Sequence, residues 1–192
     1  MQIVRNTVVA VLLTVVTTVI FGVLYPLAVT GLAQLLFPHQ ANGSLIEQGG
    51  AVVGSALIGQ LFSSPGYFHG RPSAAGDGYD ATSSGGTNLG PTSRKLADSV
   101  RAAVAAVRTE NPTAPVPVDL VTSSASGLDP DLSPAAAAFQ IPRVARERGT
   151  SEAEIQAVVN RFTQGRTLGL LGEPRVNVLL VNLALDQSFP RK

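Results

Sequence analysis

The hydrophobic positions form one continuous run near the N-terminus and shorter, interrupted patterns in the rest of the chain. Residues 7–27 (TVVAVLLTVVTTVIFGVLYPL) are almost wholly apolar, and no Asp, Glu, Lys or Arg occurs from position 6 to position 46. A helix that rises about 1.5 Å per residue crosses the ~30 Å hydrocarbon layer in about 20 residues. The pattern therefore predicts a transmembrane helix over 7–27, which Pro26 should bend or loosen as it leaves the membrane.

Two other structures are compatible with the same apolar run. A buried core helix of this length is rare in a soluble domain of this size. A cleaved signal peptide would find small residues at positions 31–33 (Gly-Leu-Ala), but its apolar core normally spans only about 7–15 residues. A retained membrane anchor fits the length of the run best.

Basic residues flank only the N-terminal end of this helix. Arg5 lies just before it, and the next basic residue is Arg71. The positive-inside rule then places the N-terminal end in the cytoplasm. We therefore predict a cytoplasmic N-terminus (1–6), a single transmembrane helix (7–27), a stalk (28–43) and an extracytoplasmic domain (44–192).

Beyond the stalk, the patterns predict a mixed α/β (α+β) domain. Two short apolar runs around Gln48-Gly49-Gly50 indicate a β-hairpin, and three prolines in 111–121 are typical of an edge strand or its lead-in. Helices are predicted where caps precede helical apolar spacing. They are 92–108, capped by Thr92 or Ser93, then 134–149 with a new start at Pro142, and 151–162 with a capping box formed by Ser151 and Glu154.

The remaining segments are less regular. Residues 174–186 fit a strand by their valines and a helix by the spacing of Val176, Leu179, Leu180 and Leu183, and we favour the helix. The stretches 63–93 and 122–133 read as long loops. Loops of such length in a compact domain usually bind or pack against something.

Composition removes several functional classes. The net charge is +1 and only 14% of residues are charged, so no basic surface predicts nucleic-acid binding. Cysteine is absent, which excludes disulfides and thiolate chemistry. The two histidines, His39 and His69, lie far apart, so no metal site is predicted.

The stretch SSGGTNLGP (83–91) resembles a phosphate-binding loop at first sight. Gly85 and Gly90 have the spacing of a Walker-type loop, but Pro91 occupies the lysine position and supplies neither charge nor N–H. A faint likeness to the SGGQ signature of transporter ATPases survives, with Thr87 in place of glutamine. Gly/Ser strings are common in turns, so a structural or partner-contacting loop is the favoured interpretation.

A tethered exported enzyme or solute-binding domain is the alternative from another class. It would need a pocket lined by His69, Asp77 and Asp80, and no serine in the chain occupies a G-x-S-x-G nucleophile elbow. We expect no catalytic residue in the chain.

The motifs together resemble the C subunit of the Kdp-type potassium-transporting ATPase of bacteria. The resemblance runs from the anchor to the last predicted helix. It is carried by GSALIGQLF (54–62), YFHGRPSAA (67–75), SGGTNLGP (84–91), the long stretch 117–149 and LGEPRVNVLLVNLALD (171–186). Two positions depart from the family pattern: Thr87 replaces the usual serine and keeps its hydroxyl, whereas Asp131 replaces a frequent histidine, so no role is carried over to it.

The resemblance implies a non-catalytic, single-span accessory subunit of a bacterial cell membrane pump. Its partners would be a channel-like potassium-translocating subunit and a P-type ATPase catalytic subunit. The family is commonly described as a chaperone that raises the ATP affinity of the catalytic subunit. On that description, the candidate nucleotide contacts are Ser84, Gly85, Gly86, Thr87 and Asn88.

The predicted topology conflicts with a nucleotide role. A domain outside the cell meets almost no ATP, and the nucleotide site of the catalytic subunit lies across the bilayer. We therefore favour a role at the outer face, where the long loops dock on and stabilise the channel-like subunit. No cofactor is expected on the chain itself, and ATP would be reached only through the complex.

Overall fold

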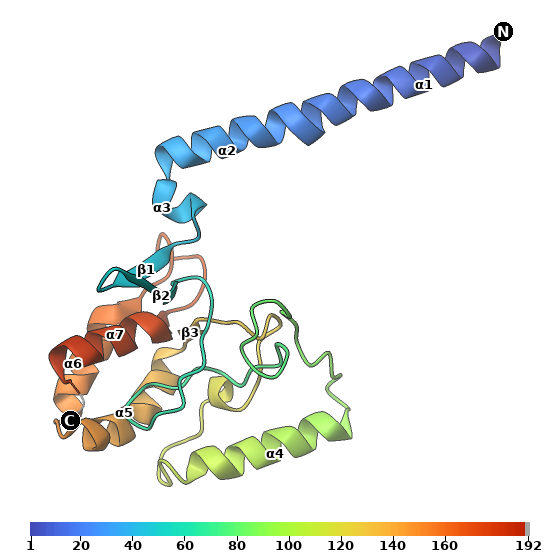
Figure 1. Ribbon diagram of the computed structural model, residues 1–192. Helices are drawn as coiled ribbons and strands as arrows, with labels where there is room; N and C mark the ends of the chain where they lie inside the picture. Colours follow the sequence, from blue (N-terminus) through green and yellow to red (C-terminus); the bar gives the residue numbers. More distant parts are fainter. Residues whose placement is uncertain (191–192) are drawn as a thin grey trace. The chain divides into compact units, whose positions relative to one another are not determined.

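The computed structural model describes residues 1–190 and divides into two compact units (Figure 1). The first unit is Met1–Leu45, and the second begins at Ile46. The first is helical, and the second is a domain of mixed helices and small sheets. The predicted fold class, a mixed α/β domain that follows one long apolar helix, is therefore confirmed.

The first unit consists of one long apolar helix and a short one. The long helix runs through α1 (Gln2–Val19), a π-helical turn (Ile20–Leu24) and α2 (Tyr25–Leu36), and α3 (Pro38–Ala41) follows. Its 35 residues are long and apolar enough to cross a membrane, and none of them is buried. The helix thus extends beyond residue 27 into the predicted stalk.

Local chemistry explains the helix in detail. The hydroxyl groups of Thr7, Thr14 and Thr17 donate to carbonyl oxygens four residues earlier at 2.8–3.0 Å, so these side chains need no water inside a membrane. Pro26 lacks an N–H, and in a regular α-helix its ring would clash with the carbonyl of Gly22. The wider π-helical turn just before it relieves both constraints.

The second unit opens with the predicted hairpin. Strand β1 (Leu45–Gln48) pairs with β2 (Ala51–Ser55) in a two-stranded sheet. The connecting residues Gly49 and Gly50 have φ of +61° and +82°. A type I′ hairpin turn requires positive φ at both central positions, which glycine adopts without steric cost.

A three-stranded antiparallel sheet and three helices form the core. The strands are β3 (Asp131–Leu132), β4 (Thr163–Gln164) and β5 (Arg175–Asn177), in the order β3-β5-β4. Helices α5 (Pro134–Arg148), α6 (Glu152–Phe162) and α7 (Val178–Ser188) pack on β5. Figure 1 shows these three helices gathered on one side of the domain. The apolar side chains they bury include Leu132, Ile141, Val144, Ile155, Val159, Val176, Val181 and Leu185.

Helix α4 (Arg94–Arg108) lies outside this core. It forms where predicted and is capped by Ser93, whose side chain accepts a hydrogen bond from the Leu96 N–H. None of its residues is fully buried, although Val107 packs against the core. The long stretch between β2 and α4 contains only turns and bends, as predicted for 63–93.

Three local predictions need correction. The predicted new start at Pro142 is wrong, because α5 continues through it. The proline removes one hydrogen bond to the carbonyl of the exposed Ala138, while the buried neighbours Ile141 and Arg143 hold the helix in place. The predicted strand in 111–121 is wrong too: its prolines lack the N–H groups a strand needs, and a short 3-10 helix, η2 (Val118–Leu120), forms instead.

The third correction concerns residues 174–186, for which the sequence fits both a strand and a helix. Each interpretation is correct for part of the segment. Residues Arg175–Asn177 form the central strand, and the favoured helix begins only at Val178. The strand ends and the helix begins at Asn177, because its side-chain oxygen accepts a hydrogen bond from the Leu180 N–H at 3.1 Å and caps α7.

Two buried amides hold the irregular loop 65–69 against the core. The Asn182 side chain of α7 accepts the Phe68 N–H at 2.8 Å and donates to the Phe68 carbonyl at 2.9 Å. The Gln140 side chain of α5 does the same for His69, at 2.8 and 3.1 Å. Both amides are only 1% exposed, so they replace the strand partner that this backbone lacks.

Two arginines extend this arrangement, which we call the polar clamp (Gln140, Arg143, Arg148 and Asn182). The Arg143 guanidinium donates to the Tyr67 carbonyl at 2.9 Å and to Glu110 at 2.8 Å. Arg148 donates to the carbonyl of residue 66 at 2.7 Å, and its guanidinium lies 5.1 Å from the centre of the Tyr67 ring. Within residues 1–190, no buried side-chain nitrogen or oxygen lacks a hydrogen-bond partner.

The clamp predicts a large stability loss for Asn182→Leu. The substitution keeps the shape but leaves the Phe68 N–H and C=O buried without partners, at about 1–3 kcal/mol each. We expect the free energy of unfolding of the full chain in detergent to fall by about 2–4 kcal/mol. The exposed Asn160 on α6 provides the matched control, and Asn160→Leu should change stability by less than about 0.5 kcal/mol. Equal losses for both variants would contradict the clamp.

The capping box of Ser151 and Glu154 forms as predicted, and we expect its contribution to stability to be lost in acid. Hydrogen bonds from the Thr150 hydroxyl, and then from Ser151, lower the pKa of Glu154 to about 2. A lowered carboxyl pKa contributes stability above the ordinary value of 4.5, and the contribution disappears as the pH falls through 2. Glu154→Gln should therefore lower the melting temperature at pH 7, and the difference from the parent should vanish near pH 2. A difference that stays constant over this range would contradict the cap.

Candidate functional site

Three predicted motifs meet on one loop segment, residues 124–129. The Ser73 hydroxyl donates to the Gly127 carbonyl at 2.6 Å, and the Arg71 guanidinium pairs with Asp129 at 3.0 Å. The Gly59 N–H donates to the carbonyl of residue 128 at 2.8 Å. Segment 124–129 therefore supports motifs that lie more than forty residues earlier in the chain.

The backbones of the motifs approach segment 124–129 most closely at Gly127. Its φ is +67°, and a Cβ atom there would lie 2.6 Å from the Ala75 nitrogen and 2.7 Å from the Gly85 oxygen. Both the 67–75 motif and the SGGTN loop press on this residue. No side chain fits at this position unless those backbones move.

The first half of the SGGTN loop is bound to the same segment. The Ser84 hydroxyl and the Gly85 N–H both donate to the Ser126 carbonyl, at 3.0 and 2.9 Å. A Cβ on Gly86 would lie 2.9 Å from the Ala125 carbonyl oxygen. Three of the five candidate nucleotide contacts thus serve internal packing.

The second half of the loop faces outward. Thr87 and Asn88 are exposed, and Asn88 adopts a left-handed φ of +52°. Phosphate sites usually combine free backbone N–H groups with a helix N-terminus. Here the Gly85 N–H is already bonded and α4 begins only at Arg94. Nucleotide contact by 84–88 stays a prediction, and this geometry does not resemble a phosphate cradle.

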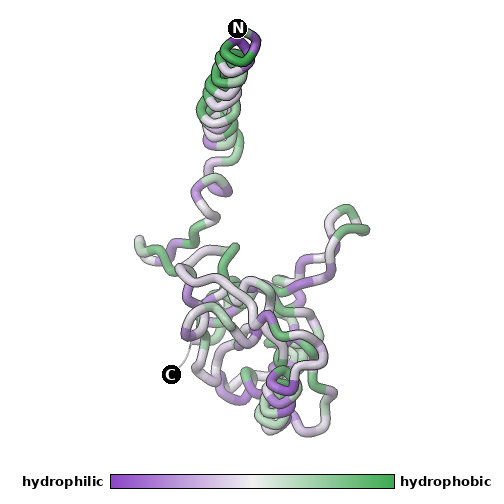
Figure 2. Tube along the Cα trace, turned by 90° about the vertical axis from the view of Figure 1, so that its right-hand side faces the viewer, coloured by the Kyte–Doolittle hydropathy of each residue, from purple (hydrophilic) through white to green (hydrophobic). Residues whose placement is uncertain are grey.

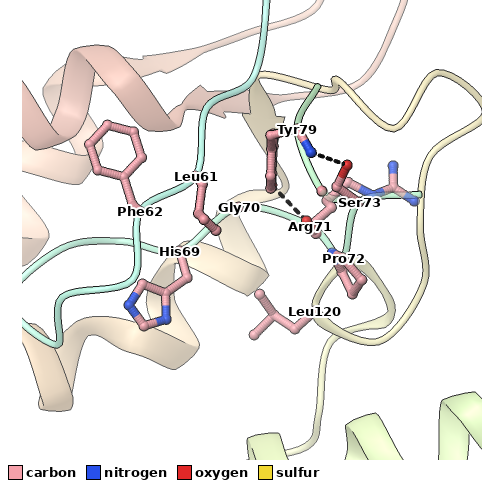
Figure 3. A pocket seen from close by; sticks show the side chains of 10 residues that line it. Leu61, Phe62, His69, Gly70, Arg71, Pro72, Ser73, Tyr79 and Leu120 are labelled. Atoms are coloured by element: carbon pink, nitrogen blue, oxygen red, sulfur yellow. Dashed lines mark hydrogen bonds between the residues drawn. The ribbon is translucent and has the colours of Figure 1, made fainter. Parts of the chain in front are cut away.

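A cavity of about 320 Å³ lies next to these loops (Figure 3). His69, Arg71, Ser73 and Tyr79 line it together with apolar groups from Leu61, Phe62 and Leu120, and residues 84–88 do not. Figure 3 shows Tyr79 folded over the 70–73 backbone, where its hydroxyl donates to the Arg71 carbonyl at 2.6 Å. The polar groups of the cavity also serve the packing of the motifs, because Arg71 pairs with Asp129, Ser73 donates to the Gly127 carbonyl and Tyr79 donates to the Arg71 carbonyl.

Two titratable groups of the cavity, His69 and Tyr79, stay in their neutral forms at neutral pH. Burial, with the Arg143 charge as the second cause, lowers the pKa of His69, whose Nε2 lies 3.1 Å from the Ser64 carbonyl oxygen. Burial, followed by the Asp129 charge, raises the pKa of Tyr79 to about 12. His69 is therefore a neutral, hydrogen-bonded group at neutral pH.

The cavity that contains His69 is not the pocket that the enzyme alternative requires. Asp77 and Asp80 do not line the cavity that contains His69. Asp80 instead accepts the Thr82 N–H and hydroxyl at 2.9 and 2.7 Å, and these hydrogen bonds lower its pKa. Across residues 1–190, no group of three or more His, Asp or Glu side chains is placed to hold a metal ion.

Sequence reasoning missed the residues that position the site. Gln140 and Asn182 are single polar residues within apolar stretches of predicted helices. A polar residue at such a position indicates a buried hydrogen-bonding group, and this is the sequence signal that could have identified them. Asp131, which stands where the family pattern often has histidine, has partners for its negative charge within the domain. Its carboxylate pairs with Arg175 at 3.1 Å and accepts a hydrogen bond from the Asn177 side chain at 3.2 Å. Burial, the largest cause, raises the pKa of Asp131.

Known proteins match almost the whole chain. Residues 7–187 match the family described as KdpC: K+-transporting ATPase, c chain. The chain is 57% identical over 186 residues to the potassium-transporting ATPase KdpC subunit of Koribacter versatilis, covering 97% of this chain and 96% of that protein. It is 62% identical over 178 residues to the corresponding subunit of Myxococcus xanthus, covering 91% and 84%. The subunit of Rhodospirillum rubrum is 59% identical over 175 residues, covering 90% and 91%.

These matches include the anchor helix, the three loop motifs and the core helices described above. The extent and the level of identity show the family directly. The chain belongs to the KdpC family and is a membrane subunit of a potassium-transporting ATPase complex, an accessory part of the pump.

Proposed function

We propose that this subunit is a non-catalytic brace on the outer face of the pump. Its single helix anchors it in a bacterial cell membrane, and its domain binds a channel-like potassium-translocating subunit from outside. The P-type catalytic subunit of the same complex hydrolyses ATP, and this chain supports assembly and activity without touching the nucleotide.

The charge distribution around the anchor carries this proposal. Arg5 precedes the long apolar helix, and the next charged residue of either sign is Glu47. A basic residue only at the N-terminal end favours that end inside and the domain outside. An outside domain is separated from cellular ATP by the bilayer, so its effect on the pump must act through protein contacts.

The loop geometry supports docking over nucleotide binding. Ser84, Gly85 and Gly86 hold the loop on segment 124–129, and only Thr87 and Asn88 remain at its exposed tip. A rigidly held loop with two exposed polar residues suits a protein contact, because little conformational entropy is lost on binding.

A topology measurement tests the first part of the proposal. Protease added to sealed protoplasts should degrade the domain and leave an N-terminal tag intact, and inverted vesicles should give the reverse pattern. Arg5→Gln combined with Gln40→Lys and Asn42→Lys moves the positive charge across the helix and should invert part of the population. A domain protected in protoplasts and cleaved in inverted vesicles would refute the brace.

Two loop variants separate docking from nucleotide contact. Gly86→Ala places a Cβ 2.9 Å from the Ala125 carbonyl oxygen and should displace the loop at a cost of about 1–3 kcal/mol. We expect it to lower the yield of assembled complex, whereas Gly90→Ala, where a Cβ meets open space, should not.

The double variant Thr87→Ala/Asn88→Ala removes the exposed tip without touching segment 124–129. Docking predicts a lower yield of complex with unchanged ATP photolabelling per assembled pump. The chaperone hypothesis predicts the opposite: full assembly and weaker labelling. The two readouts are measured on the same preparation, so each outcome selects one function.

A further inference from the structure

The second unit carries an apolar projection that its own core does not use. Residues 165–173 form a hairpin-like loop, which we call the leucine finger. Its side chains Leu168, Leu170 and Leu171 are 88%, 81% and 64% exposed. In Figure 2, hydrophobic positions (green) lie at the tips of loops that project from the trace of the domain. Three exposed leucines at one tip are not needed for folding.

The finger has a fixed shape. Thr167 and Leu171 exchange backbone hydrogen bonds, with the Thr167 N–H donating at 2.8 Å and the Leu171 N–H at 3.0 Å. The Gly169 N–H closes the turn on the carbonyl of Arg166 at 3.1 Å. At the neck, Arg166 donates to both carboxylate oxygens of Glu173 at 2.8 and 2.7 Å. The leucines therefore project from a closed loop.

Leu168 occupies a conformation that leucine rarely adopts. Its φ is +55°, in the left-handed region that favours glycine or asparagine. Its side chain gains nothing from the domain, because it is 88% exposed. A strained backbone that presents an exposed apolar side chain indicates that the side chain has a binding partner elsewhere.

The arginines next to the finger are paired with carboxylates. Arg166 pairs with Glu173, and Arg175 at the base pairs with Asp131 at 3.1 Å. The exposed Leu57 lines a surface depression together with Asp131 and Arg175, so the surface at this point is mixed and the apolar character is confined to the finger.

We propose that the leucine finger inserts into an apolar recess on the outer face of a membrane-spanning partner subunit of the same complex. This inference rests on the proposed function, because the finger must lie outside the cell. It goes further by assigning the contact to three named side chains in the back half of the domain, away from the SGGTN loop.

The observations favour a protein recess over a lipid surface. Lipid-inserted loops usually combine apolar residues with aromatic rings and free basic groups that attract anionic headgroups. The finger contains no aromatic residue, and both neighbouring arginines are already paired with carboxylates. Fluid lipid also does not require the fixed, strained geometry of Leu168, whereas a shaped recess does.

Photo-crosslinking in the assembled complex tests the contact. A benzophenone amino acid at position 170 should crosslink to a multispan subunit of the pump. The same probe at Val118, which is 65% exposed on η2, is the matched control and should give a much weaker crosslink to that subunit. Crosslinks from position 170 to lipid only, to a second copy of this chain, or to nothing would overturn the proposal.

Leu168→Gly separates a binding role from a structural one. Glycine relieves the left-handed strain, so the melting temperature of the full chain in detergent should stay the same or rise. Loss of the inserted side chain should nevertheless lower co-purification with the multispan subunits by on the order of tenfold. A variant that co-purifies as well as the parent chain would overturn the proposal.

The outcomes also distinguish this inference from the proposed function. If protease shows the domain outside and the complex assembles with the Leu168→Gly chain, only the finger contact fails. If the domain proves to lie inside, the proposed function fails before the finger is considered.

Discussion

The geometry of this domain depends on buried side chains that replace a missing strand. Loop 65–69 packs against the core helices, and the backbone N–H and C=O groups that it buries require partners. The Asn182 side chain supplies both partners to Phe68, and the Gln140 side chain supplies both to His69. The Arg143 guanidinium donates to the carbonyl of residue 67. Because both amides lie on core helices, the position of the loop is fixed by the same packing that fixes α5 and α7.

That constraint spreads from the loop to the other motifs. Once residues 65–69 are held, Arg71 and Ser73 reach segment 124–129, and that segment in turn holds Ser84 and Gly85. The long loops are therefore ordered by a chain of local hydrogen bonds and glycine contacts, although the described part of 56–93 contains no helix or strand. The sheet has only three short strands, so side chains provide much of the long-range order.

The sequence predicts those features that a local signal encodes. The Gly49-Gly50 turn, the Ser93 cap and the capping box at Ser151 each depend on neighbouring residues, and each is confirmed. The predictions at Pro142 and in 111–121 fail because buried neighbours or missing N–H groups outweigh the local rule. The pairing of Gln140 with His69 joins positions seventy-one residues apart, so no periodicity could have revealed it.

If the domain lies outside and binds no nucleotide, as we propose, it can change the activity of the assembled pump by binding some conformations of its partners more tightly than others. Such a subunit has to be rigid at its contacts. A flexible contact adapts to every conformation of the partner and binds them all with similar free energy. The clamped loops and the closed neck of the finger both meet this requirement. The fixed backbone at Leu168 fits the same logic, since a side chain held at one position discriminates between recess shapes that a side chain on a mobile loop would accommodate equally.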